Sequence, residues 1–241
     1  MSPQIERIRE LKTGAKNQRD RGIKGYPRAL SMLREAIAIA RDELANTDLA
    51  ERRIQAATEL SDCFGLIGGV ERRWADEAAG DERSVHLKAA IRAYDEGFGF
   101  ESDPQYGIVN SYNLVNRLAV RLLLAPSSLA TDDCVVLDPA IAPLNVGKEL
   151  DKAASTVRQQ LAGPRRGDYW ALADLALLEV LAGRTATAAA YAEFLGLAPP
   201  DFAYVSALAS LRPLAELPVP SASALREAVS LLEGRLDRLR S

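Results

Sequence analysis

The chain has 241 residues, enough for one large domain or for a stack of short repeats that share one core. Its formal net charge of -3 at pH 7 supplies no overall positive field, so nucleic acid and anionic membranes are not expected as partners. Alanine, leucine, arginine and glutamate are abundant and aromatic residues make up 6%, a composition that favours an all-α fold.

The two cysteines, Cys63 and Cys134, lie too far apart in the sequence to suggest a disulfide framework or a zinc site. We expect both to be buried thiols, and we expect neither a metal nor a cofactor. Residues 1–21 lack the apolar core of a signal peptide. Charged residues also interrupt every apolar run before the roughly 18 residues that a membrane span requires. A cytoplasmic protein without a membrane partner is the expectation.

Apolar residues recur at helical spacing along nearly the whole chain. The predicted helices cover residues 3–20, 27–46, 49–78, 82–99, 106–125, 145–162, 168–182, 185–196, 201–216 and 222–240. Short segments with glycine, proline or aspartate separate them, as helix ends require. Residues 126–144 contain three prolines and are predicted to form a long loop or insertion.

Three segments repeat one pattern of small, aromatic and apolar positions. The first copy is Tyr26, Ala29, Leu30, Leu33, Ala36 and Ile37; the second is Ala90, Ile91, Tyr94, Gly97, Phe98 and Phe100; the third is Gly183, Ala188 and Pro200. The pattern resembles the second helix of a tetratricopeptide repeat (TPR). It predicts a single domain over residues 1–241, an all-α, TPR-like α-solenoid of four to five helical hairpins.

Close approach of helices explains the small residues of the pattern, since alanine or glycine lets two helix axes come within about 8 Å. Gly65, Gly68 and Gly69 indicate the same inside the helix predicted over 49–78. In the last helix, 222–240, apolar residues recur at heptad-like spacing. This spacing indicates a C-terminal capping helix or a dimer seam, so we expect a monomer or a weak homodimer.

Residues 84–216 resemble the TPR-like, TRAF-binding region of mitogen-activated protein kinase kinase kinases and its bacterial relatives. The resemblance is carried by Ala90 to Phe98, Tyr106-Gly107-Ile108 with Asn110, Asp168 to Ala173, Ala182-Gly183 and Ala198-Pro199-Pro200. It implies a regulatory or scaffold module, in bacteria one that belongs to a signalling or defence system. No kinase signature accompanies it.

Groups that would support catalysis are sparse in this sequence. His86 is the only histidine, and it lies in a charged helical segment where a surface or partly packed role is expected. Gly65 to Gly69 lacks the lysine and hydroxyl residue that follow a phosphate loop. No spacing of acidic residues defines an acid and base pair, so we expect no catalytic residues and no enzyme.

The most informative polar residues recur at helical spacing over 106–125: Tyr106, Asn110, Asn113, Arg117 and Arg121. Asparagine is a poor helix former, so its repeated use indicates hydrogen bonding. One interpretation is an ordinary solvated face with hydrogen bonds between helices. The other is the floor of a ligand groove, because the first helices of TPR hairpins line the concave surface.

On the second interpretation Asp62, Arg72, Arg73 and Asp174, from the neighbouring first helices, belong to the same partner-binding site. Mixed charges and amides suit a partner protein or an extended peptide, whose backbone needs both donors and acceptors. The alternative is a sensor whose arginines hold a small anionic ligand and whose curvature changes on binding.

Overall fold

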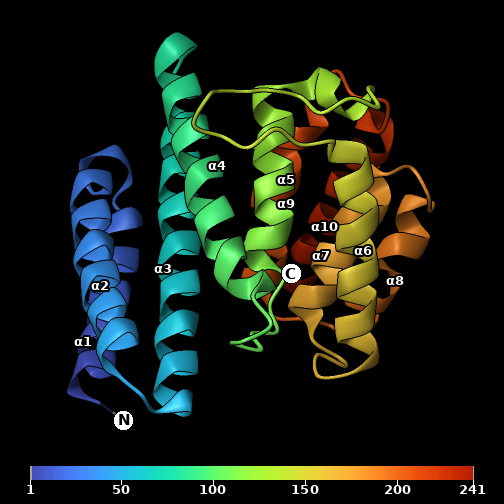
Figure 1. The fold of residues 1–241 in the computed structure, drawn as a ribbon. Coiled ribbons are helices and arrows are strands. Elements are labelled where there is room, and N and C mark those ends of the chain that lie inside the picture. The colour runs from blue at the N-terminus through green and yellow to red at the C-terminus, as the bar shows by residue number, and fades with distance from the viewer. Residues whose placement is uncertain (1, 241) are drawn as a thin grey trace. The chain divides into compact units, whose positions relative to one another are not determined.

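A computed structural model describes residues 2–240 as an all-α protein of helical hairpins (Figure 1). The helices are α1 (Pro3–Arg19), α2 (Tyr26–Asn46), α3 (Ala50–Glu77), α4 (Gly80–Ser102), α5 (Tyr112–Leu124), α6 (Val146–Ala162), α7 (Tyr169–Leu181), α8 (Thr187–Gly196), α9 (Asp201–Ala215) and α10 (Ala222–Arg240). The helix periodicity of the sequence therefore predicted the elements well. The chain divides after Val120 into two compact units.

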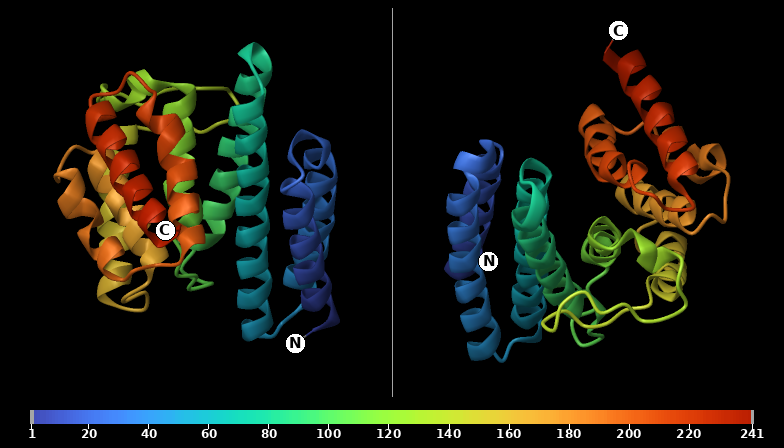
Figure 2. Two further views of the ribbon diagram at one scale, coloured as in Figure 1. Left: turned by 180° about the vertical axis from the view of Figure 1, so that it is seen from behind. Right: turned by 90° about the horizontal axis from the view of Figure 1, so that it is seen from above.

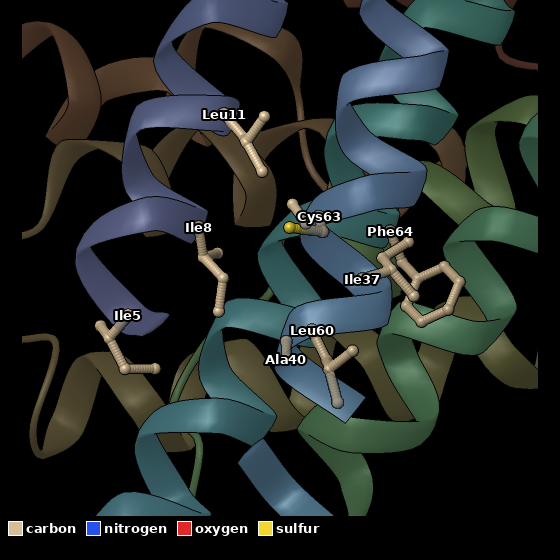
Figure 3. Packing of buried hydrophobic residues seen from close by; sticks show 9 residues of the cluster. Ile5, Ile8, Leu11, Ile37, Ala40, Leu60, Cys63 and Phe64 are labelled. Carbon is tan, nitrogen blue, oxygen red and sulfur yellow. The ribbon is translucent and has the colours of Figure 1, made fainter. Parts of the chain in front are cut away.

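In the first unit, α1 pairs with α2 and α3 pairs with α4, while α2 also packs on α3 (Figure 2). One buried cluster joins three helices: Ile5, Ile8 and Leu11 of α1, Ala36, Ile37 and Ala40 of α2, and Leu60, Cys63 and Phe64 of α3 (Figure 3). Because each helix of this layer buries its apolar face against the others, the core forms only when they stack.

The first copy of the repeat pattern occupies the buried face of α2, as a TPR second helix requires. Tyr26, Ala29 and Leu33 are at most 2% exposed. Tyr26 packs its ring 5.7 Å from that of Trp74 on α3, and its hydroxyl donates a hydrogen bond to Glu77. The small and aromatic positions of the pattern thus hold α2 against α3.

Glycines let α3 and α4 approach closely in the second hairpin. A Cβ added to Gly68 of α3 would lie 2.7 Å from the ring of Tyr94 on α4, closer than real Cβ contacts allow. The ring of Tyr94 is 1% exposed, so it fills the space that Gly68 leaves. The close-packing interpretation of the glycine run is confirmed at this position.

The second unit contains α6 to α10, with α6 against α7, α7 against α8 and α9 against α10. Asp168 caps α7 by accepting hydrogen bonds from the N–H groups of Trp170 and Ala171 at 2.8 and 3.4 Å. Gly183 follows the helix with φ +65°, the left-handed conformation that ends helices. The final helix, α10, also packs on α7 and α8 (Figure 2).

Residues 126–144 form the predicted loop. It begins with a short 3₁₀ helix, Pro126–Leu129, and contains one isolated antiparallel bridge between Val135 and Leu144. Ile141 is buried and anchors the loop. In the part of the chain from residue 2 to residue 240, no helix has the length and apolarity that crossing a membrane requires.

The cysteines differ from the expectation that both are buried. Cys63 is 0% exposed in the core of the first unit, but Cys134 is exposed because it lies on the loop instead of in a helix. Burial also raises the pKa of the Cys63 thiol to about 12.

This difference predicts selective labelling. In the folded protein, a maleimide should modify Cys134 and leave Cys63 unmodified, because only thiolates react and only Cys134 is accessible. Mass spectrometry of the intact protein and of its peptides should find a single adduct. Both cysteines should react in denaturant, and early labelling of Cys63 without denaturant would contradict the packing in Figure 3.

Candidate partner-binding site

The helix predicted over residues 106–125 begins later in the structure, at Tyr112. The Oδ1 atom of Asn110 accepts hydrogen bonds from the N–H groups of Ser111 at 2.8 Å and Tyr112 at 3.1 Å. These bonds organise the turn that starts α5, since asparagine competes for backbone groups at helix ends. The expectation that Tyr106 and Asn110 lie on a helical stripe is therefore wrong.

Tyr106 precedes α5 and packs against α4, with its ring centroid 6.1 Å from that of Phe100. It is 9% exposed and borders a hollow of about 390 Å³. The hollow is also lined by Asp95, Glu96, Gly99, Phe100 and Asp103. Tyr106 thus contributes mainly to packing within the first unit.

Asn113 is fully buried and hydrogen-bonded to the preceding hairpin. Its amide nitrogen donates to the carbonyl oxygen of Ser61 at 3.2 Å, to Ser61 Oγ at 3.0 Å and to Glu101 Oε1 at 2.7 Å. Glycines make the room for it: a Cβ on Gly97 would lie 2.5 Å from Asn113 Nδ2, and one on Gly65 would lie 2.8 Å from Oδ1. Asn113 thus fastens α5 to α3 and α4 through hydrogen bonds between helices, but its side chain is buried and does not belong to a solvated face.

Glu101, at the end of α4, completes this buried cluster. Ser61 Oγ donates to the same Oε1 atom at 3.1 Å. Burial raises the pKa of Glu101 to about 7, although the hydrogen bonds from Asn113 and Ser61 oppose the shift. Glu101 could not be recognised from the sequence, because it is one of many acidic residues and only its packing distinguishes it.

Arg117 and Arg121 are also buried, with 8% and 2% exposure. The guanidinium of Arg117 lies 4.2 Å from the ring centroid of Phe98, a cation–π arrangement, and its Nε is 3.7 Å from Asp95 Oδ1. Arg121, in the second unit, donates from Nη2 to the carbonyl oxygen of Ala142 at 3.2 Å. These arginines bind groups of the protein itself and do not form an exposed polar floor.

The three predicted site residues on α3 differ in how far they are exposed. Arg72 is 8% exposed, whereas the side chains of Asp62 and Arg73 are 45% and 44% exposed. Asp62 pairs with Lys12 of α1 at 2.7 Å, and Arg73 lies 3.7 Å from Asp20 at the end of α1. Asp174 lies half-buried on α7 of the second unit.

Tyr112, which sequence analysis missed, lies between Asp62 and Arg73 on the surface of the first unit. A Cβ on Gly65 would lie 3.0 Å from its ring, and one on Gly69 would lie 3.3 Å from its hydroxyl. The ring therefore rests along the glycines of α3, yet Tyr112 is 43% exposed. Asp62, Gly65, Gly69 and Arg73, spaced three or four residues apart, share one side of α3 with this ring. We call these four residues and Tyr112 the Tyr112 face.

The signal for this face was present in the sequence but incomplete. The glycines of α3 indicated close packing. The sequence did not show that the ring of Tyr112 packs against them, because the helix was predicted to begin at residue 106 and Tyr112 was placed inside it. The ring of Tyr94 packs edge-to-face against the ring of Tyr112, with their centroids 6.0 Å apart. The face thus combines an exposed aromatic ring with charges of both signs.

His86, a residue type common in catalytic and metal sites, is packed against other side chains. His86 stacks on Trp74 with ring centroids 4.3 Å apart, and its Nδ1 lies 2.7 Å from Glu71 Oε2. His86 is therefore partly packed, as predicted. Across residues 2–240, no group of three or more histidine, cysteine, aspartate or glutamate side chains is placed to hold a metal ion.

A comparison with known protein families finds a match, and it covers the first unit. A family model described as Tetratricopeptide Repeats-Sensor (TPR-S) matches residues 4–122, which span α1 to α4 and most of α5. No curated protein and no solved structure matches the chain. The resemblance of residues 84–216 to the TRAF-binding region is not confirmed. The chain thus has an all-α, TPR-like fold of helical hairpins, and its residues 4–122 are similar to the TPR-S family.

Proposed function

We propose that the first unit binds a segment of a partner protein on the Tyr112 face. TPR-type repeats generally mediate interactions between proteins. The observation that carries the proposal is the exposure of Tyr112, whose ring lies against Gly65 and Gly69 of α3. Tyr112 is 43% exposed, although the residues that follow it on α5 are buried. Tyrosine is enriched at interfaces because it supplies contact area and a hydrogen bond with little entropic cost.

The surroundings of Tyr112 favour an extended peptide as the bound segment. Gly65 and Gly69 let the ring of Tyr112 lie flat along α3, so the exposed side of the ring is available to a peptide. Asp62 and Arg73 lie at the two ends of the face and provide an acceptor and donors for polar groups of the peptide. In this proposal Asp62 and Arg73 contact the partner, while Asn113 and Asn110 position Tyr112 from behind.

The test is partner capture by the full chain carrying Tyr112→Ala and Arg73→Glu together. A protein captured from the source cells by the wild type is identified by mass spectrometry, purified and titrated by calorimetry. Loss of one aromatic anchor and reversal of one charge should weaken binding by at least about 2 kcal/mol, or roughly thirtyfold. Helical circular dichroism should be unchanged, because both side chains are exposed.

The matched control is Arg34→Glu, which reverses an exposed charge on α2 outside the Tyr112 face. It should bind the partner as the wild type does. Equal affinity of the double variant and the wild type would refute this site, and equal loss in the control would indicate a nonspecific charge effect.

The description of the matched family contains the word sensor, so a sensing role is the second candidate function. The sequence suggested a small anionic ligand for it, with a change in the curvature of the helix stack on binding. In the first unit, Arg117 already lies over Phe98 and beside Asp95. An anion bound there would have to displace these contacts. We therefore place protein binding first for this unit.

A further inference from the structure

The second unit contains a cavity of about 510 Å³ beside the start of α6. Four segments line it: the loop at 129–132, the first turns of α6, the end of α7 and the start of α10. The lining residues are Leu129, Ala130, Thr131, Asp132, Asn145, Gly147, Lys148, Leu150, Asp151, Leu181, Ala182, Gly183, Pro220 and Ser221. Small-molecule sites commonly occupy roughly 300–1,000 Å³, so the volume suits a metabolite.

Two helix amino termini meet at this cavity. In α6, Asn145 Oδ1 caps the N–H of Lys148 at 2.9 Å, and the N–H of Glu149 bonds to the carbonyl oxygen of Asn145 at 3.1 Å. The N–H groups of Val146 and Gly147 have no acceptor within the helix, because the residues four positions earlier precede it. The start of α10 contributes Ser221, and both amino termini carry partial positive charge.

The side chain of Ser221 also points to a ligand, independently of the helix amino termini. It is 6% exposed, and within residues 2–240 its buried Oγ has no hydrogen-bond partner. A serine directly before a helix usually accepts a hydrogen bond from the first turn. An unpaired buried hydroxyl is unfavourable, so a group that pairs with it would be stabilised in the cavity.

The charges around the cavity leave its positive groups available. Asp151 forms an ion pair with Arg184. The last carbonyl groups of α7 accept hydrogen bonds from the N–H groups of residues 182–184, which reduces the negative end of that helix. Lys148 lines the cavity with its side chain exposed, and Asp132 and Thr131 stand on the loop side.

We propose that this cavity binds a small metabolite through a phosphate group held by the first turn of α6, Lys148 and Ser221. Helix amino termini, lysine and a hydroxyl form the usual donor set for phosphate. Asp132 and Thr131 then accept hydrogen bonds from hydroxyl groups of the same ligand. The site lies in the second unit and outside residues 4–122, so it is independent of the proposed partner-binding face.

The experiment titrates the full chain with inorganic phosphate and with glycerol phosphate at constant ionic strength. Backbone amide resonances report the site, and saturable shifts are expected at Gly147, Lys148 and Ser221. Lys148→Ala and Ser221→Ala should each weaken binding by about tenfold. Lys152→Ala is the matched control, because Lys152 lies on α6 beyond the cavity and pairs with Glu149 at 2.7 Å.

Saturable shifts that need about tenfold more ligand in the two cavity variants, and the wild-type amount in the control, support the proposal. Absence of saturable shifts with both probes overturns it, and so does equal weakening by Lys152→Ala, which would indicate nonspecific charge attraction. Circular dichroism of each variant verifies the fold. Partner capture by the first unit is a separate measurement, so either proposal can fail without affecting the test of the other.

Discussion

The Gly97→Ala variant is expected to be less stable than the wild type by up to about 2 kcal/mol, because overpacking a tight interior costs about 1–3 kcal/mol and the helix propensity of alanine returns roughly 1 kcal/mol. The new methyl group would lie 2.5 Å from Asn113 Nδ2 and 2.6 Å from its Cγ. Asn113 cannot move aside without breaking hydrogen bonds to Ser61 and Glu101. This cost should outweigh the roughly 1 kcal/mol by which alanine favours a helix over glycine.

Gly99→Ala is the matched control for this prediction, two residues along the same helix. Its added Cβ would have no atom within 4 Å, so only the gain in helix propensity remains. The control should be more stable than the wild type by about 0.5–1 kcal/mol. Urea unfolding followed by circular dichroism measures both variants, and equal midpoints for the two would contradict the packing of Asn113 against Gly97.

The stability of the wild type should fall as pH rises from about 4.5 through about 7, because of Glu101. Its folded pKa is raised from 4.5 to about 7, mainly by burial, so the folded state binds the proton more tightly than the unfolded state. The stabilising contribution is then complete below the unfolded pKa and is lost as pH passes the folded pKa. The full change is on the order of 3 kcal/mol.

Glu101→Gln should remove this pH dependence, since an amide of similar shape stays neutral. The variant should unfold at higher urea concentration than the wild type at about pH 8, with a much smaller difference at about pH 5. Glu96→Gln, an exposed carboxylate on the same helix, is the matched control and should follow the wild-type profile. An unchanged profile for Glu101→Gln would refute the role of the Ser61–Asn113–Glu101 cluster.

Helix positions followed from local chemistry, because propensity, apolar periodicity and end signals act within a few residues. The Asp168 cap of α7, the Gly183 that ends it and the prolines of 126–144 could all be recognised without a structure. The start of α5 could not, because apolar spacing continues before Tyr112 and only the hydrogen bonds of Asn110 show where the turn ends.

The sequence by itself therefore determined an all-α, TPR-like repeat architecture and the tight helix crossings at its glycines. Only the tertiary structure decided which polar residues face outward. Asn113 and Arg117 share the spacing of a solvated stripe, yet packing buries them and leaves Tyr112, at the start of α5, exposed. Periodicity shows which residues share a side of a helix, but the neighbour that covers that side comes from elsewhere in the chain.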